Sequence, residues 1–134
     1  MTRHKIFSWP VRVYFQDTDA GGVVYHASYV NFFERARTEW LRTFGYSNAG
    51  LMKAFGIVFM VRSMKLDYLR PALLDDMLDV TAEVKDIGRS RLTLLQTVRR
   101  GDELLTEAEV HLVCVSLEGF KPVSVPEVLK SQWK

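Results

Sequence analysis

The sequence predicts a single α+β domain over residues 1–134, in which a curved antiparallel sheet wraps around one long helix. A chain of 134 residues is long enough to bury one core without disulfides or metals. Residues 28–44 show the apolar spacing of an amphipathic helix, whereas much of the remaining chain alternates apolar and polar residues as strands do. One strand, one helix and four further strands in this order are typical of the α+β class.

The first predicted strand covers residues 11–16, and Pro10 suits the start of a strand or the edge of a sheet. The long helix follows, with Ser28 as its expected cap and Gly45 just past its end. One face of this helix carries an apolar stripe rich in large aromatic residues, which a sheet has to cover. The stripe consists of Tyr29, Phe32, Phe33, Ala36, Trp40 and Phe44.

A short helical segment is predicted near residues 49–55, and four strands follow it. Their central parts are expected at residues 64–68, 78–85, 92–98 and 108–114. Gly88 and Gly101 mark hairpin turns between antiparallel neighbours. Pro71, together with Asp75 and Asp76, marks the longer connection before the third strand.

Composition and charge exclude several classes of protein. A net charge of +2 without a basic run gives no support for nucleic-acid binding. The single cysteine, Cys114, cannot form an internal disulfide and lies among apolar neighbours, so we expect a core residue in a reducing compartment. The apolar blocks at residues 6–10 and 51–61 are too short for a signal peptide and for a membrane span, which needs ~20 residues. We therefore expect a cytoplasmic protein.

The segment Asp17–His26, with the sequence DTDAGGVVYH, carries the clearest chemical signal. A carboxylate there can act as a base or nucleophile, and the N–H groups of the following helix start can polarise a carbonyl. The glycine pair permits a tight turn and close approach of a ligand. The spacing by itself favours a plainer interpretation, a turn capped by aspartate side chains. A metal site is not expected, because the acids and His26 lack a further ligand at a suitable spacing.

The segment from Val13 through His26, continuing to Arg37, resembles the signature of hotdog-fold acyl-CoA thioesterases. Within them it is most similar to the Tol–Pal system-associated branch of the 4-hydroxybenzoyl-CoA thioesterase family, and the similarity runs over nearly the whole chain. The resemblance implies a hotdog fold and hydrolysis of acyl-CoA to carboxylic acid and CoA without a cofactor. It also implies edge-to-edge dimers that assemble into a homotetramer, although the choice between dimer and tetramer stays open.

The resemblance assigns catalytic roles to Asp19 and His26. Asp19 supplies the carboxylate, either activating water or attacking to form a mixed anhydride. The His26 amide N–H polarises the thioester carbonyl, and its side chain orients substrate or water. Gly22, Val24 and Tyr25 are the expected substrate-binding residues around this pair.

Two neighbouring groups of residues have supporting roles. Asp17 and Thr18 are expected to brace the turn. Arg89, Ser90 and Arg91 join two strands with two basic side chains, a suitable clamp for the phosphates of CoA. A solvated hairpin is the alternative for this second segment.

The resemblance leaves two other functions to consider. A hotdog dehydratase or hydratase acting on acyl carrier protein is disfavoured, because those enzymes lack the run at residues 17–26. An interaction protein with weak thioesterase activity would instead bind acyl carrier protein or the cell-envelope and phospholipid-synthesis machinery, with peripheral contact to the inner membrane. Residues 126–134 could dock there, but we expect them to pack back onto the fold. The acyl chain preference is not fixed by the sequence.

Overall fold

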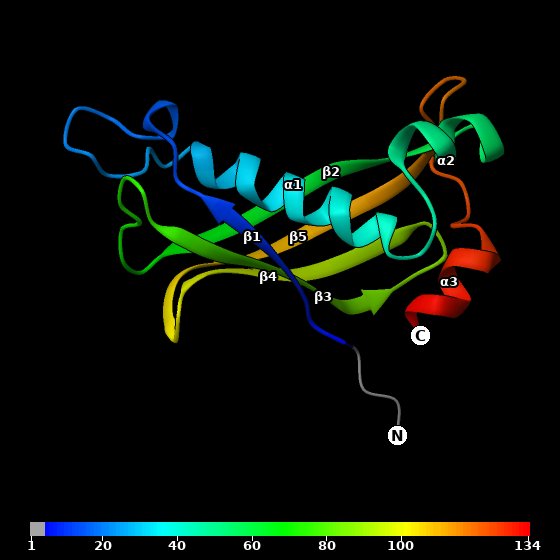
Figure 1. Cartoon of the computed structure of the whole chain (residues 1–134). Helices are drawn as coiled ribbons and strands as arrows, with labels where there is room; N and C mark the ends of the chain where they lie inside the picture. Colours follow the sequence, from blue (N-terminus) through cyan, green and yellow to red (C-terminus); the bar gives the residue numbers. More distant parts are fainter. Residues whose placement is uncertain (1–4) are drawn as a thin grey trace.

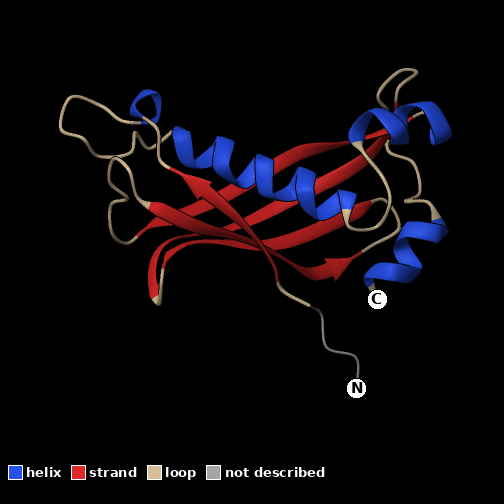
Figure 2. Cartoon of the chain, viewed as in Figure 1, coloured by secondary structure: helices blue, strands red, loops and turns tan. Residues whose placement is uncertain are grey.

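The computed structural model describes residues 5–134, which form a five-stranded antiparallel sheet with α1 across one face (Figures 1 and 2). The strands are β1 (Phe7–Arg12), β2 (Ile57–Tyr68), β3 (Met77–Ile87), β4 (Arg91–Arg100) and β5 (Glu103–Ser116), in the spatial order β1-β3-β4-β5-β2. The helices are α1 (Ser28–Arg42), α2 (Asn48–Phe55) and α3 (Glu127–Trp133), with a 3₁₀ turn η1 at Phe15–Asp17. The predicted α+β class is confirmed. The predicted long helix corresponds to α1. The structure also contains two shorter helices, α2 and α3.

The core lies between α1 and the sheet. Phe32, Phe33 and Ala36 on α1 are fully buried, and so are alternating residues of β3 and β4 such as Leu78 and Leu94. The helical stripe and the strand alternation thus meet face to face, as their periodicities require. The helix starts at Ser28 as predicted, but the Ser28 hydroxyl donates to the Asp17 carbonyl oxygen at 3.1 Å and does not cap the helix.

The first strand lies earlier in the chain than predicted. β1 ends at Arg12, whereas the sequence pattern placed a strand over residues 11–16. The Val13 N–H donates to the Asp76 carbonyl oxygen at 2.9 Å, and the chain then turns through η1 with Phe15 80% exposed. Pro10 lies within β1, which it can do because β1 is an edge strand.

The later strands follow the predicted pattern, except that β2 begins at Ile57 instead of near residue 64. Much of β2 is exposed and a register shift interrupts it between Val61 and Ser63, so its first half shows no clean alternation. Hairpins join β3 to β4 at Gly88 and β4 to β5 at Gly101, where φ is +59°, as predicted.

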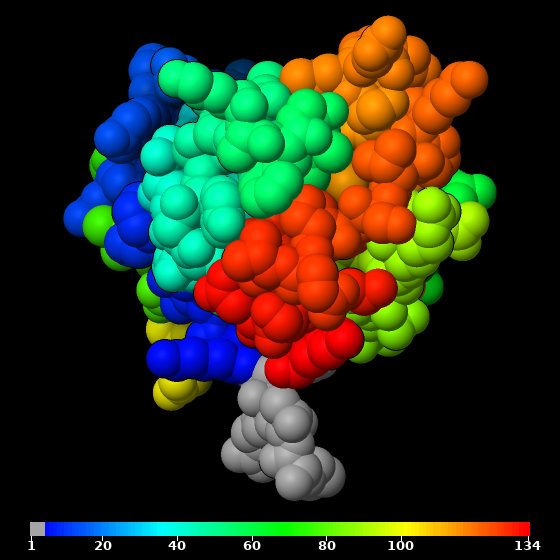
Figure 3. All heavy atoms as spheres, turned by 90° about the vertical axis from the view of Figure 1, so that its right-hand side faces the viewer, coloured from blue at the N-terminus to red at the C-terminus, as the bar shows by residue number. Residues whose placement is uncertain are grey.

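The C-terminal segment packs back onto the fold as α3, which confirms the expectation for residues 126–134. Trp133 is only 3% exposed and stacks on Trp40 with ring centroids 5.0 Å apart. Figure 3 shows α3 seated against the end of α1 on this face of the molecule. A docking role for the Trp133 side chain is therefore inconsistent with its burial. Within the described residues, no helix has the length and apolar character needed to cross a membrane.

Candidate active site

Residues 17–25 form a small hairpin between η1 and α1. The Tyr25 N–H donates to the Asp17 carbonyl oxygen at 2.9 Å, and the Asp19 N–H donates to the Val23 carbonyl oxygen at 3.0 Å. Gly22 closes the tip with φ +74°, a conformation that favours glycine, and its N–H donates to the Asp19 carbonyl oxygen at 3.1 Å. A glycine is therefore favoured at position 22, because its backbone adopts this left-handed conformation without strain.

The hairpin is fixed to the connection between β2 and β3. The Val24 N–H donates to the Ala72 carbonyl oxygen at 2.9 Å, and the Leu74 N–H donates to the Gly22 carbonyl oxygen at 3.0 Å. Val24 is 4% exposed, so its side chain belongs mainly to the core. A segment far along the chain thus determines where the loop stands.

The two carboxylates of the loop have different surroundings. Asp17 is 7% exposed, and its Oδ2 accepts the Tyr14 N–H at 2.8 Å, which confirms its predicted bracing role. Thr18 braces the same turn, since its hydroxyl donates to the Phe15 carbonyl oxygen at 2.8 Å. Asp19 is exposed, and its Oδ1 accepts the Gly21 N–H at 3.0 Å in an Asx turn. The capped turn that the spacing favoured is therefore present, with Asp19 facing solvent.

His26 lies two residues before α1 begins at Ser28. Within residues 5–134 its amide N–H has no hydrogen-bond acceptor, although its carbonyl oxygen accepts the Tyr68 hydroxyl at 3.1 Å. The imidazole is exposed and lies beside the Tyr25 ring, with centroids 4.4 Å apart. An unpaired N–H at the positive end of α1 is a donor available to a carbonyl oxygen.

A cavity of about 300 Å³ opens beside His26. Its lining residues are Val23, Val24, His26, Tyr29, Tyr68, Leu69, Arg70 and Pro71. The Tyr29 hydroxyl accepts the Ala72 N–H at 3.0 Å, and burial raises the pKa of both Tyr29 and Tyr68. Both phenols therefore stay protonated at neutral pH. The sequence gives no indication that Tyr68 belongs to this cavity. Tyr68 is the last residue of an alternating strand, and the alternation predicts only that it lies in a strand.

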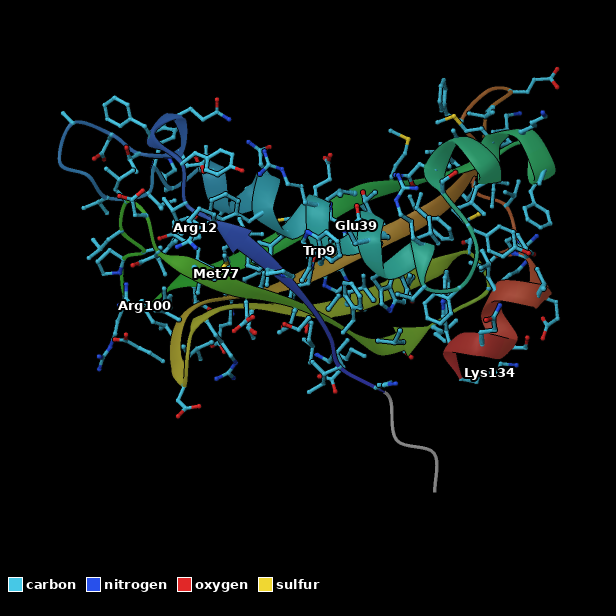
Figure 4. All side chains as sticks on the ribbon, viewed as in Figure 1. Trp9, Arg12, Glu39, Met77, Arg100 and Lys134 are labelled. Atoms are coloured by element: carbon cyan, nitrogen blue, oxygen red, sulfur yellow. The ribbon has the colours of Figure 1, made fainter. Side chains whose placement is uncertain are left out.

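Ion pairs hold the connection that supports the loop. Arg100 donates to Asp76 at 2.6 Å and to Glu103 at 2.8 Å, while Arg70 donates to the other Glu103 oxygen at 2.8 Å. These bonds join the β4–β5 hairpin to the β2–β3 connection. Figure 4 shows Arg100, Arg12 and Met77 at the end of the sheet that carries the loop.

The predicted phosphate clamp lies at the other end of the sheet. Arg89 and Arg91 are exposed, and the hairpin is anchored where the Ser90 carbonyl oxygen accepts the Cys114 N–H at 2.7 Å. The eleven residues of β3, Met77–Ile87, separate the two ends, which corresponds to roughly 30 Å. One chain therefore does not bring Asp19 and the clamp together.

The Cys114 thiol and a metal-binding cluster are the other candidates for reactive chemistry. Cys114 is fully buried, and burial raises the pKa of its thiol to about 11, so it is unsuited to act as a nucleophile at neutral pH. Within the described part of the chain, no cluster of three or more His, Cys, Asp or Glu residues is placed to hold a metal ion. Asp19 is exposed, and the His26 N–H has no hydrogen-bond acceptor within the described residues, so both groups are accessible.

Residues 13–133 match the family described as the thioesterase-like superfamily. The chain belongs to this superfamily. It is 48% identical over 130 residues to the acyl-CoA thioester hydrolase YbgC of Escherichia coli O6:H1, covering 96% of each chain. It is 45% identical over 125 residues to the acyl-CoA thioesterase YbgC of Haemophilus influenzae, covering 93% of this chain and 92% of the relative.

Solved structures agree with this membership in the thioesterase-like superfamily. A probable thioesterase from Bartonella henselae superposes with a TM-score of 0.87 at 34% identity, over 91% of this chain and 100% of the other. A protein from Aquifex aeolicus superposes with a TM-score of 0.88 at 29% identity, over 96% of this chain and 99% of the other. The hotdog-type α+β fold expected from the resemblance is thus shared with a solved probable thioesterase.

Proposed function

We propose that this chain hydrolyses acyl-CoA thioesters to free carboxylic acid and CoA at the Asp19 loop. The observation that carries the proposal is the placement of an exposed carboxylate and an unpaired amide N–H, those of Asp19 and His26, in the short segment that leads into α1. The names of the curated relatives, which share up to 48% identity with the chain, support the same substrate class.

The two groups meet the needs of thioester cleavage. The thioester carbonyl oxygen would accept the His26 N–H, whose contribution to an oxyanion is roughly 2.7–4 kcal/mol. Asp19 would take a proton from water as the water attacks the carbonyl carbon, and the C–S bond would then break to release the CoA thiolate. In the alternative route Asp19 itself attacks, and water hydrolyses the resulting anhydride. Gly22, Tyr25 and the cavity beside His26 would border the substrate.

In this proposal, the nucleotide end of CoA binds to a second copy of the chain. Arg89 and Arg91 suit the phosphates but lie at the far end of the sheet from Asp19. β2 is a twelve-residue edge strand with Met60 and Val61 nearly half exposed, a surface that favours pairing with another strand. Antiparallel pairing of two β2 strands would bring the clamp of one copy to the loop end of the other. A dimer of dimers would complete the homotetramer.

The relatives named YbgC and the resemblance to the Tol–Pal system-associated branch support a finer biological setting for this proposal. We place the chain in that branch and in the cytoplasm, with peripheral contact to the inner membrane. Acyl carrier protein is the second candidate carrier of the thioester.

Hydrolysis of a panel of acyl-CoA thioesters tests this proposal. We expect the wild type to release CoA thiol and Asp19→Asn to lose about 10²- to 10⁴-fold in kcat. Asp102→Asn, in the exposed β4–β5 turn, serves as the matched control and should retain activity. Activity that is indifferent to Asp19 would reject the loop as the reaction site. Absence of activity on every CoA ester, with hydrolysis of carrier-protein thioesters, would instead reassign the substrate.

A further inference from the structure

The Ser28 hydroxyl joins the start of α1 to the loop that carries Asp19. Ser28 is the first residue of α1, and its Oγ donates to the Asp17 carbonyl oxygen at 3.1 Å, eleven residues earlier in the chain. A serine that caps a helix would accept a hydrogen bond from a backbone N–H of the first turn. Because the Ser28 hydroxyl donates to the loop instead, it connects two segments and does not serve the helix alone.

The Asp17 carbonyl oxygen accepts a second hydrogen bond, from the Tyr25 N–H at 2.9 Å. The Tyr25 carbonyl oxygen in turn accepts the Ser28 N–H at 2.8 Å. Tyr25 and Ser28 are therefore bound to each other, and both are bound to the same carbonyl oxygen of Asp17. His26 lies in the chain between these two anchored residues.

These hydrogen bonds fix the direction of the His26 N–H. The peptide group that joins Tyr25 to His26 is planar and trans, so its C=O and its N–H point in opposite directions. Because the Ser28 N–H holds the C=O of this group, the His26 N–H points away from Ser28, and it has no acceptor within residues 5–134. The next peptide group is held as well, since the Tyr68 hydroxyl donates to the His26 carbonyl oxygen at 3.1 Å.

We propose that Ser28 is a positioning residue that aims the His26 N–H at the thioester carbonyl oxygen. This inference rests on the proposed function. A donor that is oriented in advance stabilises a developing oxyanion without first having to reorganise. If the hydroxyl is removed, the turn at residues 25–28 keeps only the Tyr25 N–H as its link to the Asp17 carbonyl oxygen. Because the carbonyl oxygen is most negative in the transition state, the loss falls on kcat more than on KM.

Steady-state hydrolysis of acyl-CoA by Ser28→Ala tests this role. We expect kcat to fall about three- to tenfold, as for one lost hydrogen bond, and KM to change by less than about twofold. Ser28→Thr keeps the hydroxyl and should retain kcat within about twofold. Thr43→Val is the matched control, because the Thr43 hydroxyl donates to the Trp40 carbonyl oxygen at 2.6 Å at the other end of α1. Its removal should leave kcat and KM unchanged.

An unchanged kcat in Ser28→Ala, or a rise in KM alone, overturns the positioning role. An equal loss of kcat in Thr43→Val also overturns it, since a general weakening of α1 would then be the cause. If Ser28→Ala does not fold, Ser28→Cys, which keeps the size but donates weakly, provides the same comparison. In each of these cases the proposed function stands as long as the wild type hydrolyses acyl-CoA and Asp19→Asn does not. A wild type without activity on any thioester would reject the proposed function and the role of Ser28 together.

Discussion

At the scale of single residues, the two aspartates of one short motif differ because the fold treats them differently. Asp17 is buried and accepts the Tyr14 N–H, whereas Asp19 faces solvent with one oxygen on the Gly21 N–H. Their spacing in the sequence does not reveal this difference. The burial of Asp17 agrees with a bracing function, and the exposure of Asp19 agrees with contact with a substrate.

Tyr68 is expected to position the His26 turn through its hydroxyl. Tyr68→Phe removes the 3.1 Å hydrogen bond to the His26 carbonyl oxygen. We expect kcat for acyl-CoA to fall about three- to tenfold, since one hydrogen bond contributes roughly 0.5–1.5 kcal/mol, with little change in Tm. Steady-state kinetics compared with Tyr46→Phe, a tyrosine packed on Phe55, provides the check. Equal kcat in the two variants would contradict the positioning role.

At the scale of elements, the loop depends on the β2–β3 connection, and that connection depends on the β4–β5 hairpin. Arg100 reaches both Asp76 and Glu103, so it links the two elements directly. Hydrogen bonds from Arg100, then from Arg70, hold the pKa of the Glu103 carboxyl below its usual range. The stabilisation from Glu103 is therefore present above the ordinary pKa of a glutamate and is lost as the pH falls through the lowered value.

The stability of wild type and Glu103→Gln should consequently converge in acid. Because exposed ion pairs contribute little, we expect a Tm difference on the order of 1–2 °C at pH 7 that shrinks as the pH falls below the ordinary pKa of a glutamate. Thermal unfolding followed by circular dichroism from pH 7 to pH 3 measures this. Glu107→Gln, an exposed carboxylate on the same strand, is the control. A difference that persists unchanged at pH 3 would refute the assignment.

At the scale of the whole molecule, the two ends of one sheet carry different parts of the proposed site. Asp19 stands near the start of β3, and Arg89 and Arg91 follow its end. In the proposal above a single chain holds only part of the acyl-CoA site, and the exposed edge of β2 is the surface proposed for a second copy. The proposed hydrolysis of acyl-CoA therefore depends on the proposed assembly, because the loop and the clamp of one site come from different copies.

Replacing both Arg89 and Arg91 by glutamine should raise KM for acyl-CoA by about tenfold or more and change kcat by less than about twofold. Mixing this double variant with Asp19→Asn gives a sharper result. If the loop of one copy works with the clamp of another, reassembled mixtures should regain activity at low substrate, because one site then has both parts intact. No recovery after verified subunit exchange would show that the clamp does not act across copies.

The sequence by itself determined the class of fold, the long helix, the β-hairpins and the turn formed by the Asp19 segment. These features are local, because periodicity, glycines and a compact motif express them over a few neighbouring residues. It misplaced the first strand and gave no sign of Tyr68, of the Arg100–Asp76 ion pair or of the Arg37–Gln96 contact. Only the tertiary structure decided these, because each depends on segments that meet across the fold. The burial of Asp17, the exposure of Asp19 and the separation of Asp19 from Arg89 likewise follow from how the strands pair, which no short stretch of sequence records.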